Sequence, residues 1–166
     1  MLRRILKSLP TRQIDDGALL EREALRLVHG QGEARHHLGR VWGEIYKRNN
    51  PEAPTEQLDF EYNRPCRAPI MLMMSTKIES QRIPAWEQIL SGAAVCQNAL
   101  IAATSLGYHA QWLSEWPNYD EDAKAAAGLT KGDYFLGFIY IGTASEAPVE
   151  RTRPQLEDVV TWYRRK

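Results

Sequence analysis

The sequence has few of the features that mark specialised classes of protein. Its 166 residues include two cysteines, Cys66 and Cys96, which do not form a C-x-x-C motif. Two isolated thiols predict neither a disulfide framework nor a zinc site, and they favour a reducing cytoplasm. No apolar run approaches the roughly 20 residues that a membrane-spanning helix needs. The basic first ten residues contain no uninterrupted apolar core, so they match a signal peptide poorly.

An excess of charge of either sign is also missing. Lys and Arg together number 21, as do Asp and Glu, so the formal net charge is zero. A dedicated nucleic-acid-binding protein usually carries a basic excess, so this balance disfavours nucleic acid as a partner, and it gives no reason to expect an anionic membrane. The length and the hydrophobic share of 43% predict one globular domain over residues 1–166.

Apolar patterning predicts a mixture of strands and helices in irregular alternation. Short apolar or alternating runs indicate strands, and apolar residues at helical spacing indicate helices. We predict strands at 25–30, 68–75, 109–114 and 134–141, and helices at 15–23, 33–47, 55–63, 84–106, 120–127 and from Pro154 onward, the last with Leu156, Val159, Val160 and Tyr163 on one face. No glycine-rich phosphate loop follows a strand, which disfavours a doubly wound nucleotide-binding fold. The pattern therefore predicts an α+β layered fold.

The predicted central helix is unusual because it has few charges after Glu87. A helix without a polar face is expected to be buried on most sides. Gly92 lies in a run of small residues and costs about 1 kcal/mol relative to alanine inside a helix, so close packing is expected to offset it. The helix belongs either to the core of a monomer or to a dimer interface. Gln97 and Asn98 are expected to find buried hydrogen-bonding partners.

Several motifs then run along the chain in one order. They are Arg67-Ala68-Pro69, Ile83-Pro84-Ala85-Trp86-Glu87-Gln88, the small-residue helix with Gln97-Asn98, Leu106-Gly107-Tyr108, Trp112, Tyr119-Asp120, Ala127-Gly128-Leu129 and Gly137-Phe138-Ile139-Tyr140-Ile141-Gly142-Thr143. Together they resemble the compact bacterial NAD(P)H nitroreductase branch of the nitroreductase family. The resemblance covers residues 65–160, whereas residues 1–64 are divergent and read as a shortened N-terminal region.

This resemblance implies a fold, an assembly and a chemistry. The fold is nitroreductase-like, with an antiparallel-rich central sheet flanked by helices. The resemblance implies a homodimer with FMN at the subunit interface. NADH or NADPH would donate hydride to the flavin, which would then reduce nitroaromatic, quinone or similar small-molecule acceptors. No catalytic side chain is required, because the cofactor carries the difficult chemistry.

Carried over by position, the resemblance implies six cofactor-binding residues: Arg12, Trp112, Leu113, Ser114, Arg151 and Arg153. The segment 112–114 falls where relatives have a strand end that contacts the flavin. The two C-terminal arginines fall where a family arginine reaches the phosphate, which suits their planar donor set. The alternatives are that Trp112 is a core residue, that Ser114 is a turn residue and that the arginines are solvated.

The sequence also departs from the family in ways that bear on cofactor binding. Relatives begin with a helix ending in Arg-Arg-Ser that holds the FMN phosphate, and here only Arg12 offers a partial substitute. A loop with Asp-His and Pro-Trp, which faces the flavin in relatives, has no counterpart. Glu115 replaces a glycine that relatives tend to have after the Ser/Thr. Its carboxylate would repel a phosphate or an anionic flavin if it pointed inward, and otherwise it lies in solvent.

These departures leave two functions open. The first is an FMN-dependent oxidoreductase, and the second is a flavin-free homologue that acts as a dimeric binding or scaffold protein. A thiol or metal enzyme is disfavoured, because neither cysteine has a histidine nearby in sequence, and apolar surroundings make thiols inert. The adjacent His36 and His37 would point in different directions on a helix. The acidic residues of the helix at 55–63 are interpreted as a solvated face.

Overall fold

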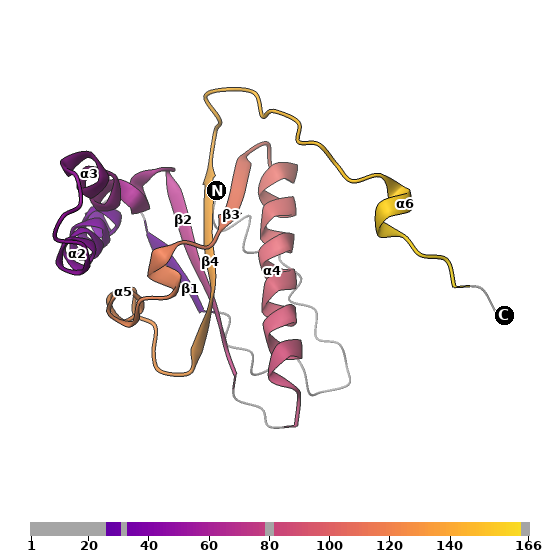
Figure 1. The fold of residues 1–166 in the computed structure, drawn as a ribbon, viewed down its shortest axis with the longest axis horizontal. Helices are drawn as coiled ribbons and strands as arrows, with labels where there is room; N and C mark the ends of the chain where they lie inside the picture. The colour runs from indigo at the N-terminus through magenta and orange to yellow at the C-terminus, as the bar shows by residue number, and fades with distance from the viewer. Residues whose placement is uncertain (1–25, 31–32, 79–81, 164–166) are drawn as a thin grey trace.

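The computed structural model describes residues 26–30, 33–78 and 82–163, and it forms three layers (Figure 1). A four-stranded sheet lies between helix α4 on one face and helices α2, α3 and α5 on the other. The elements are β1 Arg26–Gly30, α2 Glu33–Asn49, α3 Thr55–Asn63, the 3₁₀ helix η1 Arg64–Cys66, β2 Ile70–Lys77, α4 Ala85–Ser105, β3 His109–Leu113, the 3₁₀ helix η2 Trp116–Asn118, α5 Glu121–Ala126, β4 Asp133–Gly142 and α6 Leu156–Val159. The predicted α+β class is confirmed, whereas the helix predicted at 15–23 lies outside the described residues.

The sheet has the order β1-β2-β4-β3, and each neighbouring pair is antiparallel. The register of β2 against β4 shifts between Met74 and Ser75, opposite Gly137. Gly137 has φ +127°, and a Cβ there would lie 2.4 Å from the carbonyl oxygen of Leu113. A glycine is therefore required where β3 passes close to β4.

Strand β2 divides its side chains between two apolar cores, because successive residues of a strand point to opposite faces. Ile70, Leu72 and Met74 pack with α4, around Cys96 and Ala99. Met71 and Met73 pack on the opposite face with the residues that α2, α5 and β4 contribute, including Trp42, Ala123 and Phe138. The predicted buried strand is thus confirmed, since both faces of the sheet are covered at β2.

Small residues set how closely the helices approach their neighbours. A Cβ on Gly92 would lie 2.7 Å from Cδ1 of Leu136 and 3.2 Å from Cβ of Thr76. This confirms that close packing of α4 on the sheet explains a glycine inside the helix. On the other side of the sheet, a Cβ on Gly39 of α2 would lie 2.1 Å from the carbonyl oxygen of Tyr62.

The prediction that the central helix is buried on most sides is wrong for the single chain. Only one side of α4 packs on the sheet, and its other side, the outer face, carries Trp86, Leu90 and Ile101 at 61%, 54% and 54% exposure. Gln97 is exposed and Asn98 is half-buried, so Gln97 needs no buried partner. Although α4 has 21 residues, no helix within the described ranges is long and apolar enough to cross a membrane.

Beyond β4, residues 143–163 form a tail that leads away from the sheet (Figure 1). Its helix α6 covers only Leu156–Val159, so the predicted amphipathic helix is wrong beyond Val159. Its large apolar side chains are exposed, Trp162 at 76% and Tyr163 at 94%. Isolated short helices are marginal in water, and an apolar stripe stabilises a helix only when another surface covers it.

The close approach at Gly39 gives a test of the fold. We expect Gly39→Ala to destabilise the protein, because the new Cβ would meet a backbone oxygen that cannot rotate away. Overpacking costs about 1–3 kcal/mol or more, which exceeds the gain of about 1 kcal/mol in helix propensity. Urea unfolding followed by circular dichroism measures the difference. Arg40→Ala, an exposed change on the same helix, should leave stability within about 0.5 kcal/mol. A Gly39→Ala protein as stable as this control would contradict the packing.

Candidate functional site

The end of β3 carries three of the predicted cofactor-binding residues. Trp112 packs on the core beside α4, and its Nε1 donates a hydrogen bond to the carbonyl oxygen of Leu136 at 3.0 Å. Leu113 packs on the opposite core, while Ser114 follows the strand and is exposed. The side chains of Trp112 and Leu113 therefore serve packing, and the Ser114 hydroxyl is the polar side-chain group that this segment presents to solvent.

Glu115, the residue that follows Ser114, turns back into the protein. Its Oε2 lies 2.5 Å from Nη1 of Arg64, and its Oε1 lies 2.8 Å from Nη1 of Arg67. Its backbone N–H also donates to Oδ1 of Asn118 at 3.2 Å, which closes the first turn of η2. The expectation that this carboxylate lies in solvent is wrong. It is paired with two guanidinium groups and its side chain is 17% exposed.

A second carboxylate completes this group of charges. Glu61 is 1% exposed, so the interpretation of the α3 acidic residues as a solvated face is wrong at this position. Its two oxygens accept from Arg64 Nε and Nη2 at 2.6 Å each, and from Gln57 Nε2 and Trp116 Nε1 at 2.7 Å each. Burial alone would raise the pKa of Glu61, but the hydrogen bonds from Arg64 and Trp116 outweigh it and lower the pKa below its ordinary value.

We call Glu61, Arg64, Arg67 and Glu115 the charge cluster. The guanidinium of Arg67 lies 4.6 Å from the ring centre of Phe60 and 5.6 Å from that of Tyr140, within the range of cation–π attraction. Two carboxylates thus balance two guanidinium groups, and the cluster joins α3 and η1 to the segment after β3. Its arginines are already paired, which reduces their capacity to bind a further anion.

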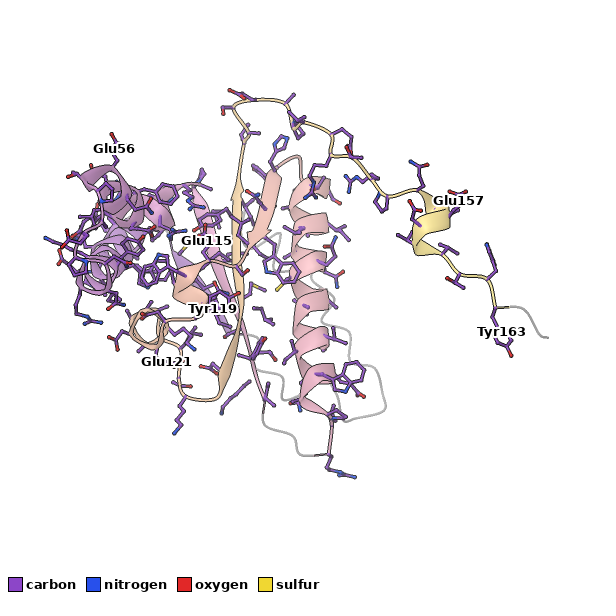
Figure 2. All side chains as sticks on the ribbon, in the orientation of Figure 1. Glu56, Glu115, Tyr119, Glu121, Glu157 and Tyr163 are labelled. Carbon is purple, nitrogen blue, oxygen red and sulfur yellow. The ribbon has the colours of Figure 1, made fainter. Side chains whose placement is uncertain are left out.

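The remaining predicted residues lie elsewhere. Arg151 and Arg153 are exposed on the tail, where Arg153 Nε and Nη2 each lie 2.9 Å from Oε1 of Glu150. Figure 2 shows Glu115 beside the sheet, whereas Glu157 and Tyr163 lie far out along the tail. The fold of one chain therefore does not bring the tail arginines together with Ser114. Arg12 lies outside the described residues. A shallow hollow lined by His37, Arg40, Val41, Glu44, Ile45 and Arg48 belongs to α2 alone and contains none of them.

Sequence patterning missed most of the charge cluster. The spacing of Glu61 and Arg64, three residues apart on adjoining helical turns, was an available signal for an ion pair. Trp116 and Glu115 approach these residues from more than 50 positions away in the chain. No local pattern reports such a contact, so the sequence alone could not find it.

The layered antiparallel fold, in which Ser114 follows the end of β3, agrees with the class expected from the sequence, a nitroreductase-like protein. The sequence matches the Nitroreductase family over residues 13–143, so this chain belongs to that family. The match confirms the predicted resemblance, and it extends into the segment 1–64, which the motifs alone leave divergent.

Individual relatives agree with this assignment. YdjA of Escherichia coli K12, whose name places it with the NAD(P)H nitroreductases, is 27% identical over 139 residues, which cover 82% of this chain and 74% of YdjA. A nitroreductase-like family protein from Bacillus cereus has a TM-score of 0.74 at 17% identity, over 98% of this chain and 82% of that one. The FMN-dependent nitroreductase NfnB from Mycobacterium smegmatis, solved with NADPH, has a TM-score of 0.70 at 11% identity, over 98% and 87%. The fold is therefore that of the family.

The described residues fit the flavin ring of FMN better than its phosphate. The exposed Ser114 at the end of β3 offers a hydroxyl and adjoining backbone groups to the polar edge of a flavin ring. The phosphate carries close to two negative charges and needs cations or several N–H donors. Arg64 and Arg67 are committed to carboxylates, so the phosphate would depend on Arg12, Arg151 and Arg153.

The buried carboxylate of Glu61 predicts a specific dependence of stability on pH. Its pKa is depressed in the folded state, so its stabilising contribution is present above the ordinary value of 4.5 and is lost as the pH falls through the folded-state value. Glu61→Gln should cost about 3–5 kcal/mol at pH 7, because it breaks a buried ion pair and leaves Arg64 with less compensation. It should also reduce the loss of stability on acidification.

Urea midpoints at pH 7 and at acidic pH check this prediction. Asp59→Asn is the matched control, because it makes the same carboxylate-to-amide change at an exposed position of α3. It should behave like the wild-type protein at both pH values. Equal midpoints at pH 7 for Glu61→Gln and Asp59→Asn would show that the Glu61 charge contributes no stability.

Proposed function

We propose that this protein is an FMN-dependent oxidoreductase that uses NADH or NADPH to reduce nitroaromatic, quinone or similar acceptors. Membership of the Nitroreductase family supports the reaction class, and the FMN and NADPH named for NfnB support the cofactors. Bound FMN would supply the two-electron chemistry. Ser114 and the backbone that follows β3 would orient the ring, while arginines would neutralise the phosphate.

We further propose that the protein acts as a homodimer, and the observation that carries this is the outer face of α4. Its exposed residues recur every three or four positions along one side of the helix, at Trp86, Leu90, Ala94, Gln97 and Ile101. An apolar stripe of this kind on a soluble protein usually marks a surface that another protein covers. This favours the dimer-interface alternative for the helix over the monomer core.

The tail supports the same assembly. It leads away from its own sheet and exposes Leu156, Val159, Trp162 and Tyr163. A second copy offers an apolar surface that such a segment could cover. The tail would then carry Arg151 and Arg153 to the partner, which would add two cations near a site whose own arginines are paired. The dimer thus offers a source for the phosphate donors that one chain does not bring together.

Cofactor binding tests the proposed function directly. Protein incubated with FMN and passed through gel filtration should retain the visible flavin spectrum. Replacing Arg153 by alanine should weaken FMN binding about ten- to a hundredfold, because a hydrogen bond to a charged group contributes about 1.5–3 kcal/mol. Arg12→Ala should act in the same direction. Arg40→Ala, an exposed arginine on α2, should leave the affinity unchanged.

Riboflavin, which lacks the phosphate, distinguishes binding of the flavin ring from binding of the phosphate. Its affinity should not change in Arg153→Ala if the arginine contacts phosphate. A wild-type protein that retains no flavin even with excess FMN would remove the oxidoreductase proposal. It would favour the alternative of a flavin-free dimeric binding or scaffold protein, which the pairing of Arg64 and Arg67 already makes physically reasonable.

The dimer is tested by a charge on the outer face of α4. Leu90→Asp should dissociate the dimer and release FMN while the chain stays folded, because Leu90 is 54% exposed in the single chain and a buried carboxylate in an interface is costly. Ala125→Asp, at an exposed position of α5 across the sheet, should leave the assembly intact. Analytical ultracentrifugation with circular dichroism measures both properties. A wild-type protein that sediments as a monomer would contradict the proposed assembly.

A further inference from the structure

The two cysteines differ in burial, because Cys66 is half-buried and Cys96 is fully buried. Cys66, at the end of η1, places its Sγ 3.5 Å from Nδ1 of His36 on α2. Neither cysteine has a histidine nearby in sequence, as expected, but the fold brings His36 to Cys66 across 30 positions of the chain. Cys96, on α4, is fully buried in the core between this helix and the sheet, and burial raises its pKa to about 12. The expectation of buried, apolar surroundings holds for Cys96, whereas Cys66 is half-buried beside an imidazole.

Cys66 is accessible, and it lies next to basic residues in the chain. Cys66 is half-buried and His36 is exposed, so reagents can reach the pair from solvent. Arg35 precedes His36 and donates from Nη1 to the carbonyl oxygen of Ala68, two residues beyond the cysteine. Arg67 follows the cysteine directly, although its guanidinium pairs with Glu115. Partial exposure and an adjoining histidine are features that reactive cysteines characteristically share, and Cys66 has both.

We propose that Cys66 and His36 form a nucleophilic thiol–imidazole pair, a covalent modification site for soft carbon electrophiles such as quinones and enones. His36 accepts the thiol proton, and the imidazolium that forms stabilises the thiolate. The sulfur forms a bond to the electron-poor carbon while the π electron pair of the electrophile moves to its carbonyl oxygen. The proton held by His36 then completes the adduct. The reaction is a net addition, so it consumes no oxidant and requires no flavin.

With a haloacetamide the same pair reacts by substitution. The sulfur–carbon bond forms, the carbon–iodine bond breaks, and iodide leaves while His36 retains the proton. Iodoacetamide is therefore a suitable probe, because its product is stable and each cysteine gives a distinct peptide in mass spectrometry. Cys96 serves as an internal reference in every sample, since it lies in the folded core.

Labelling rates measured separately for each cysteine of the 166-residue protein at neutral pH test the proposal. Cys66 should react at least about tenfold faster than Cys96, and His36→Gln should slow Cys66 by about tenfold or more, at the low end of proton-transfer effects. His37→Gln is the matched control, with the same substitution on the adjacent exposed residue of α2. It should leave the rate at Cys66 unchanged. In concentrated urea, the two cysteines should react at similar rates in all variants.

Retained protection of Cys96 reports that a variant is folded. If Cys96 is not protected in His36→Gln, that variant is not folded, and His36→Asn is tested in its place. Its labelling rate at Cys66 counts only if Cys96 is protected. A folded His36 variant in which Cys66 reacts at the wild-type rate overturns the role of His36. A wild-type protein in which Cys66 reacts no faster than Cys96 overturns the site as a whole. Neither outcome depends on whether the protein binds FMN.

Discussion

The negative charge buried at Glu61 constrains the segment that carries the candidate site. A carboxylate at 1% exposure is tolerated only when donors surround it, and here they come from Gln57, Arg64 and Trp116. Arg64 is then held where it also meets Glu115, the residue after Ser114. The chain beyond β3 is thus fixed by electrostatics rather than by apolar packing alone. Removing the charge of Glu61 on α3 should therefore alter the segment at the end of β3, although the two elements are distant in sequence.

Glu115 shows how a departure from the family pattern can be accommodated. An unpaired carboxylate beside a phosphate site would oppose binding, whereas a carboxylate that bridges Arg64 and Arg67 adds no net charge to its surroundings. The same pairing has a consequence in the other direction, because it consumes two guanidinium groups that could otherwise meet a phosphate. The cluster itself is therefore neutral, and in the proposed cofactor site the phosphate donors would come from other parts of the chain or from a second copy.

The sequence predicts the elements well and their burial less well. Short apolar runs located β2 and β4 within about two residues, because a strand buried on both faces leaves an uninterrupted apolar stretch. Gly92 was correctly assigned to close packing. The outer face of α4 was misjudged, since an apolar helix has the same sequence whether its own chain or another copy covers it. Glu61 and the approach of His36 to Cys66 depend on contacts between distant segments, which no local pattern contains.

The two faces of the sheet are covered unequally, which bears on the proposed homodimer. On one face, α2 and α5 enclose Trp42, Phe138 and Tyr140, and the aromatic rings pack edge to face within the core. On the other face, α4 covers the strands but exposes Trp86, Leu90 and Ile101. The tail begins directly after β4, carries the two candidate phosphate donors and has its apolar residues exposed. An apolar helix face and an apolar tail are both costly to leave in water, and the proposed homodimer would reduce this cost if each copy covered the other. Cofactor binding would then depend on subunit association, since the same contact that buries the tail would deliver its arginines.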